Sequence, residues 1–446
     1  MLRERIDRTH RHLLAAFAGA AECVASYPRG DLRRSNRRLP SRWLRPSLRQ
    51  LTTVDGSPSY AASLAATEHL ATGQEWRIRA AMVDVAVADA VMERASAMRQ
   101  GRAADVLTRF DGDLSGCQVP DPTGGQALSP TALEMWVRCP HAYFVSRLLG
   151  VEPVESPEEL VQVTPLEIGN LIHEVLDRFF AQQSRAGTVP GGVTRWSTEQ
   201  RAQLRHLATD AAADLAARGA TGHPLLWRQE LGRILVDLDR LLDDDEAVRA
   251  ATGRRQVSSE LAFGIRGAPA VEVVLPDGRT IRLRGSADRI DRAGDAIVVV
   301  DYKSGSARAF KDLSEDNPTA FGGKLQLPVY GYAARVALDA AQAPVSAEYW
   351  FLRKDRGKRV ALPLTDRVRQ VYAETLAVIV DAIAGGLFPH RPPAQDGWAD
   401  VVECDYCDPD GLGVAEHRDR WTRKRHDPRL AAYLRLVDPT AAGTGP

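Results

Sequence analysis

The sequence predicts an α/β (α+β) protein in which a small central mixed sheet is flanked by helices and preceded by a mostly helical segment. Two observations lead to this prediction. Strand-like runs rich in Val, Ile and Thr cluster between residues 257 and 303, and capped helical patterns lie before and after them. Residues 1 to about 110 are rich in Ala and Arg and carry helical patterns, which predicts the helical segment.

The composition limits the class of protein. The chain has 446 residues, enough for two or three domains, and its 58 basic and 58 acidic residues give no net charge, which neither favours nor disfavours a nucleic-acid partner. No apolar run is long enough to span a bilayer. The stretch from Leu13 to Ala25, interrupted by Glu22, predicts a buried amphipathic helix rather than a signal peptide. Five cysteines, an odd number, indicate a reducing compartment, so we expect a cytoplasmic protein.

Changes in composition predict the domain boundaries. A Gly-, Pro- and Asp-rich linker at 111–127 separates a helical segment, 1–110, from a main domain, 128–430, and 431–446 form a tail. The helical segment contains a strongly basic insert, Ser26 to Leu51, which either binds phosphate or is a solvated surface. The candidate DNA contacts are Arg42 and Trp43 in this insert, and Arg353 and Lys354 in a later hairpin.

The elements of the main domain follow in order. Ser129 caps a predicted helix over 131–151, and Thr164, with Glu167 three positions on, forms a capping box for a helix ending at Gln183. Further helices are predicted at about 198–218, 226–247, 324–340 and 366–385, and a last hairpin at 347–364. The sequence has no G-x-x-x-x-G-K-[ST] pattern, so no segment indicates an ATP-binding loop of that type.

A predicted β-hairpin at 280–305 carries the candidate chemistry. Its strands are "TIRLRGSADRI" and "AIVVVDYKSG", joined by the turn "DRAGD", and the apolar second strand is expected to be buried on both faces. Asp301 and Lys303 share one face of that strand, Tyr302 points the other way, and Asp288 lies roughly opposite on the first strand. Two close carboxylates repel unless a cation lies between them, which favours Mg²⁺ or Mn²⁺, with Lys303 orienting a water molecule or an anionic oxygen. The alternative is an ordinary buried ion pair between Asp301 and Lys303.

Other side chains could belong to the same site. His173 lies four residues after Gly169 on one helix face, where the small glycine would let the helix approach the sheet; the alternative is an ordinary core or surface histidine. Glu260 is either a further carboxylate or a plain edge residue. Gln326 and Tyr330, at positions i and i+4 of a helix, either face a substrate together or form an ordinary half-buried face.

The cysteines suggest a second centre. Cys404 and Cys407 form a C-x-x-C pattern, which is typical of metal or redox sites. Cys139, in "RCPHAYF", is remote in sequence. A third cysteine so far away suggests a cluster that joins the two ends of a domain.

Five motifs, in order, resemble one known family. The stretches "LSPTALEMWVRCPHAYF", "GNLIHEVLDRFF", "GSADRID", "VVVDYKSG" and "LQLPVYGYA" are similar to the PD-(D/E)XK nuclease domain of the RecB and AddB type, and most similar to the AddB-like branch with an iron–sulfur cluster. The resemblance spans about Leu128 to Leu430, and implies the PD-(D/E)XK restriction-endonuclease-like core. The segment "SYPRGDLR…PSRWL" resembles the end of a helicase-like region. The chain therefore looks like the C-terminal part of a longer AddB-type subunit, or a short relative.

The resemblance also implies residue roles. It implies that Mg²⁺ or Mn²⁺ is bound by His173, Asp288, Asp301 and the backbone carbonyl of Tyr302. Lys303 would position the attacking water and stabilise developing charge. Gln326 and Tyr330 match the family's third motif and would orient the substrate or Lys303.

One position departs from the family pattern. The family has a third cysteine six residues after the C-x-x-C pair, and this chain has Gly413 there. Three thiolates could still hold a three-iron or a labile four-iron cluster; otherwise the cluster is lost.

The resemblance implies a metal-dependent DNA exonuclease for double-strand-break end processing, with an ATP-dependent helicase/nuclease subunit as partner. A stand-alone CRISPR-associated exonuclease agrees less well with the N-terminal segment and the tail. The alternative from another class is a non-catalytic DNA-binding or scaffolding subunit. The intact set of His, Asp, Asp and Lys argues against that alternative, whereas Gly413 and the missing motor favour it.

Overall fold

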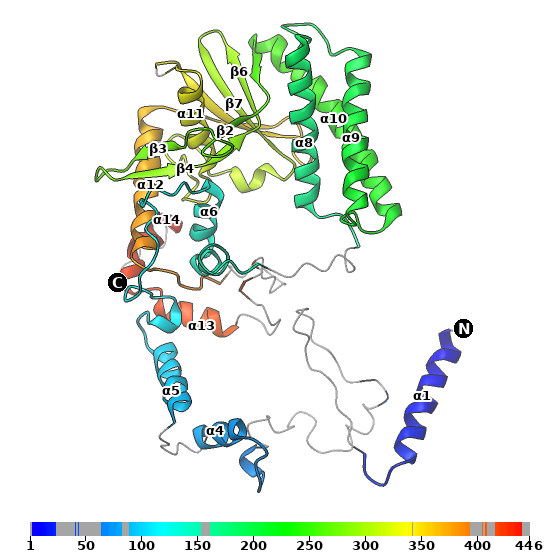
Figure 1. Ribbon diagram of the computed structural model, residues 1–446, viewed down its shortest axis with the longest axis vertical. Coiled ribbons are helices and arrows are strands. Elements are labelled where there is room, and N and C mark those ends of the chain that lie inside the picture. The colour runs from blue at the N-terminus through cyan, green and yellow to red at the C-terminus, as the bar shows by residue number, and fades with distance from the viewer. Residues whose placement is uncertain are drawn as a thin grey trace. The chain divides into compact units, whose positions relative to one another are not determined.

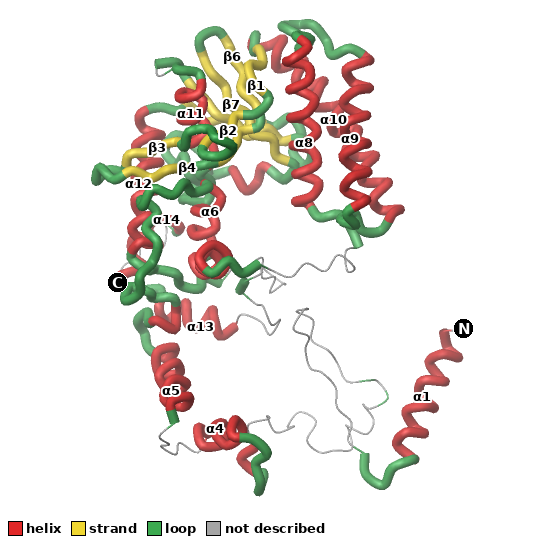
Figure 2. Tube along the Cα trace, viewed as in Figure 1, coloured by secondary structure: helices red, strands yellow, loops and turns green. Residues whose placement is uncertain are grey.

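The computed structural model describes residues 2–23, 41, 43, 64–82, 89–152, 161–340, 342–392, 404, 406–407 and 415–438. The chain divides into two compact units. The first comprises Met1–Phe110 and Pro392–Lys424, and the second comprises Asp111–Arg391 and Arg425–Pro446. Figures 1 and 2 show their helices and strands.

The described elements of the first unit are helices. They are α1 (Leu2–Ala18), α4 (Gly73–Met82), α5 (Ala90–Ala103) and α13 (Ala415–Lys424). The side chain of Asp89 caps α5, because its Oδ1 accepts hydrogen bonds from the N–H groups of Val91 and Met92. The ammonium group of Lys424 and the guanidinium group of Arg423 donate to carbonyl groups in the last turn of α5, where the helix dipole favours cations.

The buried helix predicted over Leu13 to Ala25 is wrong. Helix α1 ends at Ala18, and most of its side chains in this stretch, including Leu14, are exposed. Gly19 follows directly, and glycine is a poor helix former because of its conformational entropy.

The second unit is built on a small mixed sheet, as the sequence predicts, and this sheet has five strands. The strands lie in the order β1 (Arg255–Ser258), β6 (Arg289–Ala293), β7 (Ala296–Lys303), β8 (Val345–Phe351) and β9 (Arg359–Pro363). Strands β7 and β8 are parallel, and the other neighbours are antiparallel. The chain crosses from β7 to β8 through a helix, the usual connection for parallel strands. Strand β7 is buried along nearly its whole length, which confirms the prediction from its apolar sequence.

Helices cover the sheet on both sides (Figure 1). One side has α8 (Pro165–Ala186), α9 (Thr198–Ala217) and α10 (Pro224–Thr252); the other has α11 (Gln326–Ala337) and α12 (Asp366–Ala384). The first three helices share a hydrophobic core with Val298, Val300 and Tyr302 of β7. Since side chains alternate along a strand, Asp301 and Lys303 face the opposite way.

Shorter elements complete the second unit. The helical ones are α6 (Pro130–Arg138), α7 (Pro140–Tyr143), a π-helical turn (Phe144–Leu148) and α14 (Ala431–Val437). There are also 3₁₀ turns at Arg109–Asp111, Ala307–Phe310 and Pro428–Leu430. The turn Arg109–Asp111 begins in the first unit. The hydroxyl of Tyr433 on α14 donates to the carbonyl of Val137 on α6 over 2.8 Å, and its ring packs edge-on against Trp136. Helix α14 therefore packs against α6.

One predicted helix is shorter in the structure, and another is longer. The helix after Ser129 is capped as predicted, since Ser129 Oγ accepts from Ala132 N over 3.2 Å, but it ends at Arg138. Pro140 explains this end, because proline lacks an N–H and restricts the residue before it. Thr164 caps α8, since its hydroxyl accepts from Glu167 N over 3.2 Å, which is the Thr164 half of the predicted capping box. The helix runs to Ala186, beyond the predicted end at Gln183.

The first strand of the predicted hairpin is broken into three short strands. They are β4 (Thr280–Leu283), which pairs with β3 (Val271–Val274), then β5 (Gly285–Ala287), which pairs with β2 (Leu261–Phe263), and finally β6. Only β6 pairs with β7, and their turn is the two residues Gly294 and Asp295 instead of five. Gly294 has φ of 60°, the left-handed conformation that such tight turns require.

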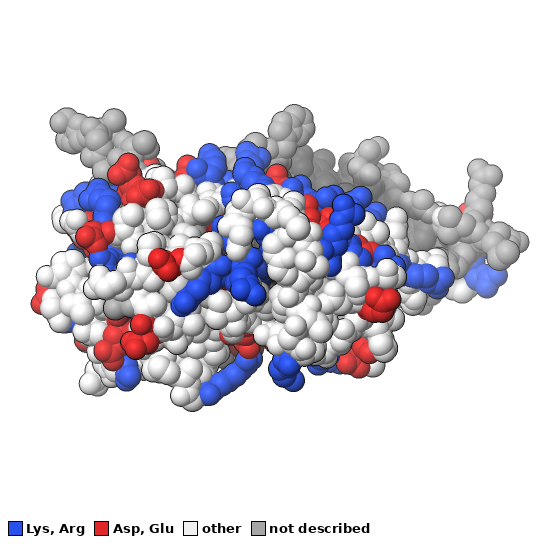
Figure 3. Space-filling model, turned by 90° about the horizontal axis from the view of Figure 1, so that it is seen from above, with Lys and Arg blue, Asp and Glu red and all other residues white. Residues whose placement is uncertain are grey.

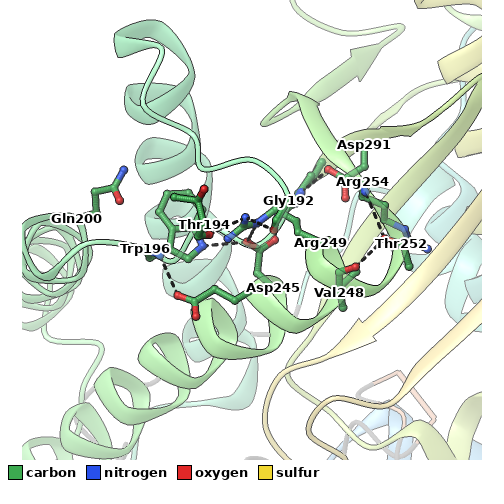
Figure 4. A network of polar contacts seen from close by, with 12 residues as sticks. Gly192, Thr194, Trp196, Gln200, Asp245, Val248, Arg249, Thr252, Arg254 and Asp291 are labelled. Carbon is green, nitrogen blue, oxygen red and sulfur yellow. Dashed lines mark hydrogen bonds and ion pairs between the residues drawn. The ribbon is translucent and has the colours of Figure 1, made fainter.

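A buried ionic network fixes β6 to α10 (Figure 4). Arg289 of β6 donates to Asp291 over 2.6 Å and to Asp245 of α10 over 2.8 Å. The other oxygen of Asp245 accepts from Arg249 over 2.8 Å and from the indole N–H of Trp196 over 2.9 Å. Arg289, Asp245, Arg249 and Asp291 have almost no exposed surface. Arg289 directly follows Asp288, so this network holds the strand start from which Asp288 projects.

No described helix has the length and apolar character needed to cross a membrane.

Candidate active site

The end of β7 brings the predicted hairpin residues together. Arg289 pairs with Val300 across the β6–β7 ladder, so Asp288, one residue before β6, comes next to the end of β7 that holds Asp301. The backbone N–H of Tyr302 donates to Asp288 Oδ2 over 2.7 Å. The sequence expectation that Asp288 lies roughly opposite Asp301 therefore agrees with the structure, although Asp288 lies at a strand break rather than near the turn.

His173 of α8 lies at the same point. Its Nδ1 atom is 2.8 Å from Asp288 Oδ1, in a half-buried position. Burial by itself would lower the pKa of His173, but the hydrogen bond to Asp288 and the negative charges of Asp288 and Asp301 outweigh burial and raise that pKa. His173 is thus directed toward the aspartates and not into an apolar core.

A polar chain runs from Asp301 to α11. The ammonium of Lys303 forms an ion pair with Asp301 Oδ2, and it donates to Gln326 Oε1 over 3.1 Å. The amide of Gln326 donates to the hydroxyl of Tyr330, one helical turn further, over 3.1 Å. The predicted pair of Gln326 and Tyr330 therefore does share one face of α11, and that face is turned toward Lys303.

The charges at this site depend on one another. Burial raises the pKa of Asp301 above its ordinary value, in spite of the opposing effect of the Lys303 ammonium. Burial would lower the pKa of Lys303, but the charge of Asp301 and the hydrogen bond to it raise that pKa instead. The lysine is thus protonated at neutral pH, with a cationic head next to two carboxylates. Asp301 and Lys303 therefore form the ion pair given as the alternative interpretation, and the same two residues also belong to the candidate site.

The donor set suits a hard divalent cation. The imidazole of His173 contacts Asp288, and the charges of His173 and Asp288 act on the Asp301 carboxyl group; oxygen-rich sets of this kind favour Mg²⁺ or Mn²⁺ over softer metals. The carboxylate of Asp301 has almost no solvent contact, so a buried cation near it would offset the repulsion between Asp301 and Asp288.

Glu134 of α6 is a site residue that sequence reasoning missed. Its Oε1 accepts from the N–H of Leu325, at the start of α11, over 2.6 Å. Burial raises the pKa of Glu134 to about 7, although the Leu325 N–H and the charges of Lys324 and Lys303 oppose this rise. The only signal in the sequence is a lone carboxylate on an otherwise apolar helix, in "SPTALEMW".

Some sequence expectations need correction. A Cβ on Gly169 would lie 3.7 Å from the nearest side-chain atom, an ordinary contact, so the approach of α8 to the sheet does not require glycine. Glu260 lies between β1 and β2 and forms an ion pair with Arg266 over 2.7 Å, so it is no further carboxylate of this site. The guanidinium group of Arg353 forms ion pairs with Glu230 and Asp237 of α10, so its charge is already paired within the protein rather than free for DNA.

The other candidate DNA contacts are Lys354, Trp43 and Arg42. Lys354 is exposed. The ring of Trp43 stacks on His10 of α1, with centroids 5.2 Å apart. Arg42 and Gly413 lie outside the described residues.

The candidate cluster cysteines are divided between the units. Cys139 is buried at the end of α6 in the second unit. Cys404 and Cys407 belong to the first unit, where Cys407 N donates to the Cys404 carbonyl over 3.0 Å in one tight turn. The sulfur atoms of Cys404 and Cys407 lie within 4.8 Å of each other, as a C-x-x-C metal site requires. Whether Cys139 shares a cluster with them stays a prediction.

The small mixed sheet with helices on both sides is the fold expected for a PD-(D/E)XK-type domain, and comparison with known families agrees. The sequence profile of the PD-(D/E)XK nuclease superfamily matches residues 127–410, more than half of the chain. The chain belongs to the PD-(D/E)XK nuclease superfamily.

Among curated proteins, the chain is similar to one kind of enzyme component, the B subunit of an ATP-dependent helicase/deoxyribonuclease. It is 28% identical over 282 residues to this protein from Lacticaseibacillus casei (strain BL23), a match that covers 59% of this chain and 23% of that protein. It is 31% identical over 226 residues to the protein of the same name from Moorella thermoacetica, covering 48% and 18% respectively. The match thus takes in less than a quarter of either relative's length.

Proposed function

We propose that this chain is a metal-dependent DNA exonuclease that processes double-strand breaks as part of a helicase–nuclease complex. One observation carries the proposal: His173, Asp288, Asp301 and Lys303, from three separate segments, meet at the end of one buried strand. The two relatives, by their names, are helicase/deoxyribonuclease subunits, which supports DNA as the substrate and a helicase subunit as the partner.

The side chains have distinct proposed roles. A divalent cation held by His173, Asp288, Asp301 and the Tyr302 carbonyl would supply positive charge that neutralises the phosphate and lowers the pKa of a water molecule. Lys303 positions the attacking water and stabilises charge that develops on the phosphate oxygens. Gln326 receives a hydrogen bond from Lys303 and so fixes the direction of its ammonium group.

The charge distribution supports a polyanionic substrate. The net charge is zero, yet Lys and Arg gather near the middle of the face drawn in Figure 3. A local excess of positive charge attracts DNA even when the total is neutral. We propose further that residues 128–430 form the nuclease domain, with 1–110 corresponding to the end of a helicase-like region, 111–127 to a linker and 431–446 to a tail.

The purified chain should degrade linear DNA in the presence of Mg²⁺ or Mn²⁺, because the site supplies ligands for these cations. EDTA should abolish the activity, and excess Mg²⁺ should restore it. The assay follows release of acid-soluble nucleotides from uniformly labelled linear DNA, with a covalently closed circle as the control for exonuclease action. A chain that binds DNA without degrading it under any of these conditions supports the scaffolding alternative instead.

We also propose that Cys139, Cys404 and Cys407 hold an iron–sulfur cluster. Three sulfur ligands can hold a metal ion, and thiolates are the usual ligands of such clusters. Because glycine replaces the family's remaining cysteine at Gly413, one iron lacks its usual protein ligand, and the cluster should be oxygen-sensitive.

Protein purified without oxygen should therefore contain iron and sulfide and absorb visible light, and Cys404→Ser should lose both. Cys117→Ser is the matched control, because Cys117 is exposed and lies outside the proposed set. A Gly413→Cys variant should keep its iron longer in air. Equal iron content in the Cys404→Ser and Cys117→Ser variants would rule the cluster out.

A further inference from the structure

A basic pocket adjoins the candidate active site. Its volume is about 550 Å³, and it lies between α6, the loop before α11 and the residues that follow α12. Its lining includes four cationic side chains, Arg138, Arg147, Lys324 and Arg391, and one carboxyl group, that of Glu134. Arg138 and Arg147 are exposed, and neither forms an ion pair within the described part of the chain. This excess of positive charge suits an anionic ligand.

The pocket connects to the nuclease residues through Glu134. Glu134 lines the pocket and also accepts the hydrogen bond from Leu325 N, one residue before Gln326. The charges of Lys303 and Asp301 act on the Glu134 carboxyl group, so these groups are close in space. Glu134 therefore lies between the pocket and the polar chain of Lys303, Gln326 and Tyr330.

The pocket wall presents an aromatic side chain. Phe321 lines the pocket and has 38% of its surface exposed, unlike most large apolar side chains of this unit. Phe321 and its neighbour Ala320 have φ of 59° and 43°, in the left-handed region that costs free energy for residues other than glycine. The loop keeps this conformation because Asn317 Oδ1 accepts from Phe321 N over 2.9 Å and Thr319 Oγ1 accepts from Gly322 N over 3.2 Å.

We propose that this pocket binds the single-stranded part of a DNA substrate, with one base stacked on Phe321 and the adjacent phosphates contacting Arg138 and Arg147. The inference rests on the proposed nuclease function and adds to it the place where the strand is held. Aromatic side chains next to cations are the common way to bind single strands without sequence preference. A duplex fits less well, because its bases already stack on each other and present no free face to Phe321.

The test measures the binding of fluorescein-labelled oligo(dT) to the full chain by fluorescence anisotropy, in EDTA so that no cleavage occurs. Phe321→Ala should raise Kd about tenfold, the loss expected for one stacked base, without changing the salt dependence. Phe321→Trp should keep Kd close to that of the parent chain, since a Trp ring also stacks on bases. The double variant Arg138→Gln with Arg147→Gln should reduce the slope of log Kd against log salt concentration by about 0.7 for each phosphate that the variant no longer neutralises.

Two matched controls lie outside the pocket on α8. Leu166→Ala removes another exposed apolar side chain, and Arg185→Gln removes another exposed arginine; both should bind like the parent chain. Unchanged Kd in Phe321→Ala together with an unchanged salt slope in the arginine variant would overturn the pocket proposal. So would an equal effect of Phe321→Ala on a blunt duplex. A parent chain that binds oligo(dT) in this way but never degrades DNA would leave the pocket in place and reject the nuclease function.

Discussion

Asp301→Asn should abolish DNA degradation and leave the fold intact. The change removes a negative charge next to the proposed cation and keeps the shape of the side chain, which is almost fully buried. Lys303→Ala should retain metal binding but lower kcat by about 10²–10³-fold, the usual effect of losing one group that stabilises the transition state. Initial rates on linear DNA at saturating Mg²⁺ measure both effects, and calorimetric titration with Mn²⁺ measures metal binding.

Two exposed neighbours provide matched controls for these variants. Asp312→Asn and Lys311→Ala make the same chemical changes on the loop after β7, where both side chains are exposed. They should degrade DNA at the parent rate. Parent-like activity in Asp301→Asn or in Lys303→Ala would contradict the assignment of the active site. Loss of Mn²⁺ binding in Lys303→Ala alone would instead show that the lysine organises the ligands.

The core of the site could be predicted because its information is local. Asp301 and Lys303 lie on one strand, Gln326 and Tyr330 lie on one helical turn, and alternation or helical periodicity places each pair on one face. The position of His173 could not be derived in this way. It depends on where α8 crosses the sheet, and only the family resemblance linked His173 to Asp288.

The rest depends on contacts between distant parts of the chain. Glu134 joins the site because α6 packs against the start of α11, and Leu325 is 191 positions away from it. The break before β6 could not be predicted from the hairpin alone either, because β4 and β5 pair with strands outside it. Strand propensity in residues 280–290 indicates that strands form, but not which partner strand each part of the stretch selects.

Asp245→Ala should destabilise the second unit by about 3–5 kcal/mol, the usual cost of removing one partner of a buried ion pair. Both oxygens of Asp245 are in use, and the change leaves the guanidinium groups of Arg289 and Arg249 buried with fewer partners. Urea unfolding followed by tryptophan fluorescence is a suitable measurement, since Trp196 also donates to Asp245 and reports on this region. The main transition should shift to a clearly lower urea concentration.

Asp243→Ala is the control on the same helix. Asp243 also forms an ion pair, with Arg201, but its side chain is 58% exposed, and exposed pairs contribute about 0.2–1 kcal/mol. The two variants therefore lose the same chemical group, and the sites differ in burial and in the number of partners of the carboxylate. Because Arg289 directly follows Asp288, Asp245→Ala should also lower the rate of DNA degradation at temperatures where the variant is still folded, whereas Asp243→Ala should not. Equal unfolding midpoints for the two variants would contradict a structural role for the buried network. Parent-like activity in a destabilised Asp245→Ala variant would show that the bonds to His173 and Tyr302 alone position Asp288.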